Sequence, residues 1–334
     1  MITLPNAGGA GPALVGRLAP SPTGALHIGN ARSFLIAWLL ARSAAARLVL
    51  RIEDLDTPRV RAESVHQCME DLRWLGLSWD GEPVVQTSRA CEHARAVSML
   101  HAAGLAYPCT CSRREIELAA SAPHEGEDGP RYPGTCRTRA GAAVPTEAHA
   151  WRLVVEPGAV PFTDGFAGRQ SFDVDRGTGD FVIARRTAGA VLAAYQLAVV
   201  VDDAWQGVTQ VIRGRDLLPS TARQMLVARA LSGLGWICPS PSYFHVALVV
   251  GPDGRRLAKR HGDTRLATYR AAGVPAGRVL AWLGESLGAG PRDWLARQPN
   301  VLEHLLAGAA DWPGTARQEP LVFGPADDAW LRGV

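Results

Sequence analysis

Residues 17–30 read Arg17-Leu-Ala-Pro-Ser-Pro-Thr-Gly-Ala-Leu-His27-Ile-Gly29-Asn30, and with the residues on either side they indicate a strand, a loop and a helix in that order. The apolar run 14–18 predicts a short strand, the prolines and glycine after it predict a loop, and the apolar residues of 29–41 predict a buried helix. Free N–H groups at a helix start bind phosphate, Gly29 lets backbone approach a ligand, and His27 can donate to a phosphate oxygen. Alternatively, these residues only shape a tight turn, and spacing alone does not decide.

Strand and helix patterns alternate beyond this stretch. Residues 47–53 predict a strand, and helical patterns follow over 59–75 and 89–103. This alternation is typical of an α/β domain with a parallel sheet. The sequence pattern then changes over 107–185, where the cysteines cluster and a loop is acidic and rich in proline and glycine. This change predicts an insertion. The later patterns are an apolar run at 191–201, a helix at 220–233, a strand at 243–250 and helices at 269–287 and 294–307.

These patterns divide the chain into five parts. We expect a flexible leader over 1–13, the two halves of the α/β domain over 14–106 and 186–250, the insertion over 107–185, and a basic loop with a small helical domain over 251–334.

The composition excludes several protein classes. The chain has 334 residues, of which 47% are hydrophobic, and a net charge of +3, which excludes a disordered or collagen-like protein. Its longest apolar stretch, Phe34 to Ala41, is far shorter than the ~20 residues that span a bilayer. No signal-peptide pattern is visible at the start. We therefore expect a soluble, cytoplasmic protein without a membrane partner.

A second polar loop, Asp253-Gly-Arg-Arg256-Leu-Ala258-Lys259-Arg260-His-Gly262, holds the only lysine among 35 basic residues. A basic loop of this kind is usually a solvated surface. A compact ammonium differs from a planar guanidinium, however, because it can follow the negative charge that develops as pyrophosphate leaves a nucleotide. Lys259 is therefore a candidate for phosphate chemistry.

Three of the six cysteines are close in sequence, at Cys109, Cys111 and Cys136. Three thiolates would supply three of the four ligands of a tetrahedral zinc, and His124 is a chemically ordinary candidate for the fourth. The alternative is a hairpin with reduced, metal-free cysteines. The number of cysteines is too small for a disulfide scaffold.

Together, these residues resemble a known family. His27-Ile-Gly-Asn30 resembles the HIGH motif and Arg256-Leu-Ala-Lys259-Arg260 the KMSKS motif of class I aminoacyl-tRNA synthetases. Four further segments resemble the glutamyl branch: Gly16 to Gly24, Arg51-Ile-Glu53-Asp-Leu-Asp-Thr-Pro-Arg59, Tyr195-Gln-Leu-Ala-Val-Val-Val-Asp-Asp203 and Val211-Ile-Arg213-Gly-Arg-Asp-Leu-Leu218. One departure is Ala258, where the family has serine, so a hydroxyl contact to the nucleotide is missing.

The resemblance implies a Rossmann-like catalytic domain that activates L-glutamate with ATP and Mg²⁺. About seventy residues follow the Lys259 loop. This part is shorter than in the glutamyl-tRNA synthetases, so the resemblance implies the truncated branch, the glutamyl-queuosine tRNA(Asp) synthetases. These enzymes activate glutamate without tRNA and transfer it to queuosine in the anticodon of tRNA(Asp). The rival interpretations are a truncated glutamyl-tRNA synthetase that charges a tRNA 3′ end, and an inactive paralogue that binds RNA or protein.

The resemblance also implies roles for individual residues. His27 and Lys259 would be catalytic. The implied ATP-binding residues are His27, Gly29, Asn30 and Lys259, and the glutamate-binding residues are Arg17, Ser21, Glu53, Tyr195 and Arg213. A structural zinc, one per chain, would be held by Cys109, Cys111, Tyr132 and Cys136.

Overall fold

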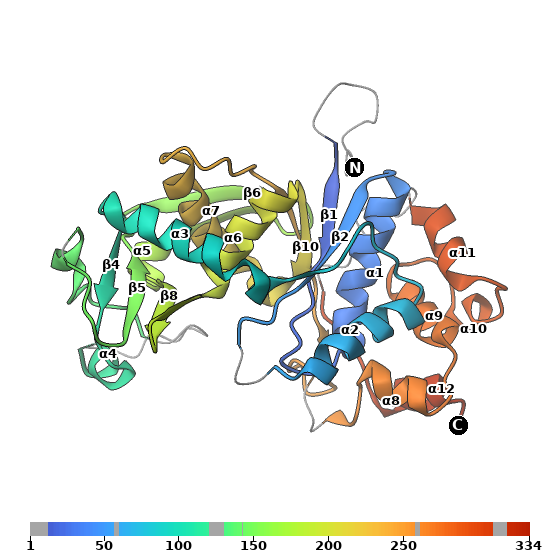
Figure 1. The fold of residues 1–334 in the computed structure, drawn as a ribbon. Helices are drawn as coiled ribbons and strands as arrows, with labels where there is room; N and C mark the ends of the chain where they lie inside the picture. The colour runs from blue at the N-terminus through green and yellow to red at the C-terminus, as the bar shows by residue number, and fades with distance from the viewer. Residues whose placement is uncertain (1–12, 57–59, 120–129, 142, 258–260, 310–318) are drawn as a thin grey trace.

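A parallel sheet lies at the centre of the molecule and begins with the strand that precedes the loop quoted above. The computed structural model describes residues 13–56, 60–119, 130–141, 143–257, 261–309 and 319–334. Strands β1 (Val15–Leu18), β2 (Arg47–Ile52) and β3 (Val84–Val85) pair in parallel in that order. β10 (Gln210–Gly214) lies beside β1 and pairs in parallel with β11 (Ser242–Val246) (Figure 1). The predicted α/β class with a parallel sheet is confirmed.

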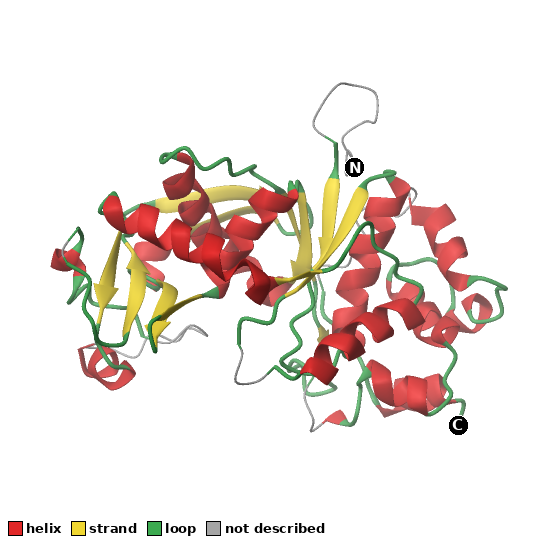
Figure 2. Ribbon diagram, viewed as in Figure 1, coloured by secondary structure: helices red, strands yellow, loops and turns green. Residues whose placement is uncertain are grey.

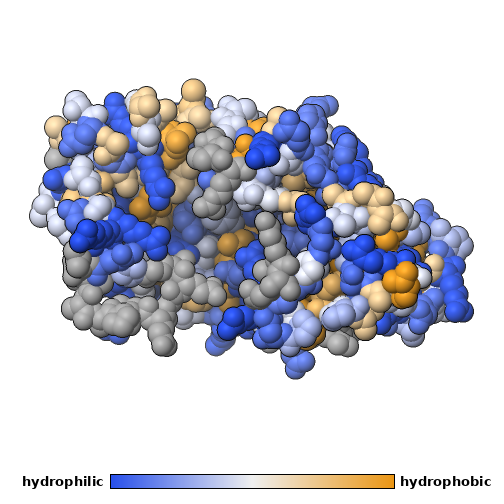
Figure 3. Space-filling view, turned by 90° about the horizontal axis from the view of Figure 1, so that it is seen from below, coloured by the Kyte–Doolittle hydropathy of each residue, from blue (hydrophilic) through white to orange (hydrophobic). Residues whose placement is uncertain are grey.

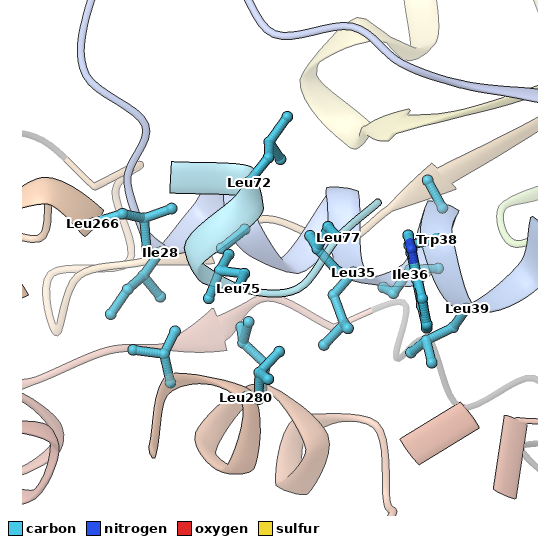
Figure 4. Close-up of a cluster of buried hydrophobic side chains, with 14 of the residues drawn as sticks. Ile28, Leu35, Ile36, Trp38, Leu39, Leu72, Leu75, Leu77, Leu266 and Leu280 are labelled. Atoms are coloured by element: carbon cyan, nitrogen blue, oxygen red, sulfur yellow. The ribbon is translucent and has the colours of Figure 1, made fainter. Parts of the chain in front are cut away.

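One half of the molecule packs around α1 (Ile28–Ser43), the helix that the quoted stretch predicts. This helix is apolar on nearly every face, and its Ile28, Leu35 and Leu39 are buried. Leu72 and Leu280 belong to the same buried cluster (Figure 4). The helices of this half are α1, α2 (Ala62–Trp74), α8 (Leu266–Ala271), α9 (Ala276–Ser286), α10 (Arg292–Leu295), α11 (Val301–Gly308) and α12 (Pro325–Arg332).

The other half contains the segment predicted as an insertion, and this segment supplies strands to two sheets. An antiparallel sheet has the order β4 (Ala106–Cys109), β5 (His149–Leu153), β8 (Val182–Thr187), β9 (Ala190–Ala193). The hairpin of β6 (Ala159–Asp164) and β7 (Gly168–Asp173) instead joins β11, so the parallel sheet continues into it. The helices are α3 (Ala90–Ala102), α4 (Arg113–Ala119), α5 (Val174–Gly177), α6 (Tyr195–Gln206) and α7 (Leu218–Ser232). Helices α3, α6 and α7 pack against one another (Figure 2).

Several predicted elements are divided in the structure. The apolar run 191–201 contains the end of β9 and most of α6, because a buried strand and a buried helix look alike in sequence. The predicted strand 243–250 is divided between β11 and β12 (Val249–Val250), and β12 pairs with β13 (Leu321–Val322). The helical stretch 269–287 breaks where Pro275 caps α9, because proline cannot continue a helix. The domain boundaries stay predictions, and residues 1–12 of the leader lie outside the described part.

Figure 3 views the molecule from below, the side toward which β1 and β2 run in Figure 1, and hydrophilic and hydrophobic side chains are intermixed there. Within the described residues, no helix is long and apolar enough to cross a membrane.

Candidate active site

A single cleft at the carboxyl ends of β1, β2 and β10 brings together the predicted nucleotide and glutamate residues. Its volume is about 1030 Å³. The predicted residues that line it are Arg17, Ser21, His27, Gly29, Asn30, Glu53, Tyr195 and Arg213. They come from β1, the β1–α1 loop, the first turn of α1, the residue after β2, the start of α6 and β10. Lys259 and its neighbours Ala258 and Arg260 lie outside the described residues, but Arg256, two residues before them, lines the same cleft.

His27 is the N-cap residue of α1, whose first turn lines the cleft. Its Nδ1 accepts a hydrogen bond from the Gly29 N–H at 3.1 Å, and its own N–H donates to the Asn30 side chain at 3.1 Å. An imidazole that accepts through Nδ1 carries its proton on Nε2 when neutral. Burial and the nearby Arg256 lower the pKa of His27 to about 4. At neutral pH the residue therefore holds an Nε2–H donor.

Gly29 is required for this cap. A Cβ at Gly29 would lie 2.9 Å from Cε1 and 3.0 Å from Nδ1 of His27. A side chain there would push the imidazole off the backbone N–H, so the glycine of the motif serves the capping histidine as well as the approach of a ligand.

Arg213 is a buried cation that lacks an acidic partner. Its side chain donates to His245 (3.0 Å), Tyr195 (3.2 Å), Gln224 (2.8 Å) and Thr221 (2.8 Å), and all four acceptors are uncharged. Within the described residues, no carboxylate oxygen lies within 4.0 Å of its guanidinium. Only 5% of Arg213 is exposed. A buried charge without a counter-charge is costly, so the cleft at Arg213 is suited to an anionic ligand.

Arg17 belongs to a buried ion-pair network that sequence reasoning missed. Asp203 Oδ1 lies 3.1 Å from Arg17 Nε and 2.7 Å from Arg51 Nη1, and Arg51 also pairs with Glu53 at 3.2 Å. Burial raises the pKa of Glu53, although the positive charges of Arg51 and Arg17 act to lower it. Within the described part of the chain, the two terminal nitrogens of Arg17 have no hydrogen-bond partner. Arg17 is thus anchored at Nε, with its other donors available to a ligand.

The neighbouring Asp202 holds a second set of partners, of which Gln86 lines the cleft. It accepts from Gln86 (2.8 Å) and Arg89 (2.7 Å) and contacts His93 (3.0 Å). Asp202 and Asp203 both occur in the segment that resembles the glutamyl branch, but nothing in the sequence assigns them these partners. Ser21 is exposed, and its hydroxyl lies 3.3 Å from that of Thr23.

The three clustered cysteines meet at one end of the antiparallel sheet. Their sulfur atoms all lie within 4.8 Å of one another, and those of Cys111 and Cys136 are 3.5 Å apart. The Tyr132 hydroxyl lies 3.3 Å from the Cys109 sulfur and 3.7 Å from the Cys111 sulfur. Tyr132 is 2% exposed. The alternative fourth ligand, His124, lies outside the described residues.

Comparisons with known proteins agree on one family. Residues 13–291 match the family model described as tRNA synthetases class I (E and Q), catalytic domain. The chain is 45% identical to a protein of Rhodopirellula baltica named Glutamyl-Q tRNA(Asp) synthetase, with 93% of this chain and 98% of that protein covered. It is 48% identical to a protein of the same name from Nocardia farcinica, with 87% and 88% covered.

The fold is similar to that of a solved glutamate-tRNA synthetase from Elizabethkingia anophelis. The TM-score is 0.75 at 23% identity, with 96% of this chain and 70% of that chain covered. At this identity the likeness concerns the fold alone.

Proposed function

The chain belongs to the class I tRNA synthetases for glutamate and glutamine, and within them to the glutamyl-Q tRNA(Asp) synthetases, so we propose that it activates L-glutamate with ATP and transfers it to queuosine in tRNA(Asp). One observation supports this most strongly. The eight predicted ATP- and glutamate-binding residues that the structure describes line a single cleft, in which a buried Arg213 lacks an acidic partner. We also propose that this tRNA-modifying activity is cytoplasmic.

In the proposed activation step, the α-carboxylate of glutamate attacks the α-phosphorus of ATP and pyrophosphate leaves. Arg17 and Arg213 bind the carboxylates of glutamate, Glu53 binds its ammonium group, and Tyr195 and Ser21 contribute hydroxyl contacts. The electrostatic role of His27 follows from its geometry, because the capping bond fixes the ring and leaves Nε2–H to donate to phosphate oxygens.

Lys259 supplies a positive charge to the departing pyrophosphate in this mechanism. Mg²⁺ bound to ATP neutralises part of the phosphate charge. In the second step a hydroxyl of the modified base attacks the activated carbonyl and AMP leaves. AMP is a good leaving group, so no general base in the cleft is assigned to this step.

The first step can be tested by ATP–pyrophosphate exchange without tRNA. We expect exchange with L-glutamate, and none with aspartate as the control amino acid. Arg213→Lys keeps the charge but loses the fixed fork of donors, so it should raise the KM for glutamate and leave the KM for ATP unchanged. Exchange that appears only after addition of tRNA would support the truncated glutamyl-tRNA synthetase. No exchange under either condition would support an inactive paralogue.

We also propose that the cysteine cluster holds one structural Zn²⁺ per chain. Tetrahedral zinc with bonds of about 2.3 Å to sulfur requires sulfur atoms about 3.8 Å apart, and the three thiols already lie within 4.8 Å of one another. The buried Tyr132 hydroxyl next to two of these sulfurs supports it as the fourth ligand. The ion would tie β4 to the segment that carries Tyr132 and Cys136.

Metal analysis of the protein, purified without a chelating step, tests the zinc proposal. We expect one zinc per chain in the wild type, and loss of zinc in Cys136→Ser. The fourth ligand is tested by Tyr132→Phe, which should lower zinc retention, and His124→Ala, which should not. The reverse result would replace Tyr132 by His124, and a wild type without zinc would refute the site.

A further inference from the structure

Arg213 is hydrogen-bonded to a buried histidine on β11, which in turn contacts a buried aspartate on β6. Its Nε donates to Nε2 of His245 on β11 at 3.0 Å. The other ring nitrogen of His245, Nδ1, lies 2.6 Å from Oδ2 of Asp164, the last residue of β6. His245 and Asp164 are each 2% exposed. A buried chain of three side chains thus runs from the predicted insertion to the cleft.

The donors and acceptors of this chain allow only one arrangement. A guanidinium has no acceptor, so Nε2 of His245 must accept the hydrogen bond from Arg213. A neutral imidazole that accepts at Nε2 has its proton on Nδ1, and this proton points to the Asp164 carboxylate. Burial and the positive charge of Arg213 lower the pKa of His245, in agreement with a neutral ring.

Asp164 is itself fixed by backbone groups. Its Oδ1 accepts hydrogen bonds from the N–H groups of Phe166 (3.0 Å), Ala167 (2.8 Å) and His245 (3.1 Å). Gly165 permits this turn, because a Cβ there would lie 2.1 Å from the ring of Phe244. The β6–β7 hairpin is therefore locked against β11 at the residue that orients His245.

We propose that Asp164 and His245 are positioning residues that set the plane of the Arg213 guanidinium for the carboxylate of glutamate. This inference rests on the proposed role of Arg213 in glutamate binding. Tyr195, Gln224 and Thr221 hold the two terminal nitrogens of Arg213, and His245 provides the acceptor for Nε. These four bonds leave one N–H of Nη2 for the carboxylate. Without the acceptor at His245, the guanidinium can rotate and turn this N–H away from the ligand. A hairpin of the predicted insertion thereby determines how well the catalytic half binds its amino acid.

Steady-state ATP–pyrophosphate exchange on the full chain tests this role. His245→Phe keeps the ring shape but removes both hydrogen bonds, and it should raise the KM for glutamate about tenfold, the cost of one hydrogen bond to a charged group. The KM for ATP and the kcat should stay near the wild-type values. His245→Gln, whose side-chain oxygen can replace Nε2 as acceptor, should restore most of the lost affinity. Asp164→Asn should raise the KM for glutamate in the same direction.

His149→Phe is a matched control, because His149 is also buried, at 5% exposure. Among the described residues, its one side-chain hydrogen bond is to the backbone carbonyl of Glu147, outside the cleft. This variant should leave the KM for glutamate unchanged. Equal KM values in His245→Phe and His245→Gln, or a loss confined to kcat, would overturn the positioning role. If Arg213→Lys itself leaves the KM for glutamate unchanged while exchange proceeds, the assignment of Arg213 is wrong and the positioning role is wrong with it. If Arg213→Lys raises the KM for glutamate but the His245 variants leave this KM unchanged, the proposed function stands and the positioning role alone is refuted.

Discussion

Acidification should destabilise the folded protein through His27, the residue that caps α1. The pKa of His27 is lowered to about 4 in the fold, from 6.5 for an unperturbed imidazole. Between these two values the unfolded chain binds a proton that the folded chain does not, so stability falls as the pH falls. Moving from pH 7.5 to pH 5 should reduce the free energy of unfolding by about 2 kcal/mol through this group alone.

The assay is urea unfolding of the wild type and of His27→Asn at both pH values. Asparagine is among the best N-cap residues, so the variant should keep a stability close to wild type at pH 7.5. It lacks the imidazole, so its loss of stability at pH 5 should be smaller than that of the wild type by about 2 kcal/mol. Identical pH dependence in the two proteins would refute a neutral, buried His27. The variant should also activate glutamate about a hundredfold more slowly at pH 7.5, because the Nε2–H donor is gone.

Three further substitutions test other parts of the cleft. Asp203→Asn breaks the buried pairs to Arg17 and Arg51, so urea unfolding should show a loss of about 3 kcal/mol, and an unchanged stability would contradict the network. Lys259→Arg should slow pyrophosphate exchange at least about tenfold although the charge is kept, and near-normal turnover would make the single lysine incidental. Gly29→Ala should lower stability by about 1 kcal/mol through loss of the cap. The control Gly177→Ala should leave stability unchanged, because a Cβ there meets no atom within 4 Å. Equal losses of stability in the two variants would argue against the contact with His27.

The sequence predicted those parts of the site that local patterns determine. The strand, loop and helix at 15–43 follow from apolar runs, prolines and glycines, and the resemblance to the glutamyl branch is confirmed by the family match. Each of the eight predicted ATP- and glutamate-binding residues in the cleft lies in a motif that can be recognised in the sequence. Their common place follows from the topology, because the carboxyl ends of neighbouring parallel strands meet at one edge of a sheet.

The partners of these residues could not be predicted, because they are tertiary contacts. Asp203 is 186 residues from Arg17, and Asp164 is 81 residues from His245. A sequence pattern shows that an aspartate is present but not which arginine it faces. The β6–β7 hairpin lies in the predicted insertion, and its pairing with β11 depends on a register that the sequence does not encode locally.

The transfer of radiolabelled glutamate to tRNA(Asp), with and without queuosine, measures the proposed activity itself. Unfractionated tRNA from cells that make queuosine and from cells that lack it provides the two substrates, with tRNA(Glu) as the control acceptor. We expect label on queuosine-containing tRNA(Asp) alone, in a linkage that survives removal of the tRNA 3′ end. Label on the 3′ end of tRNA(Glu), or equal labelling of tRNA(Asp) that lacks queuosine, would contradict it.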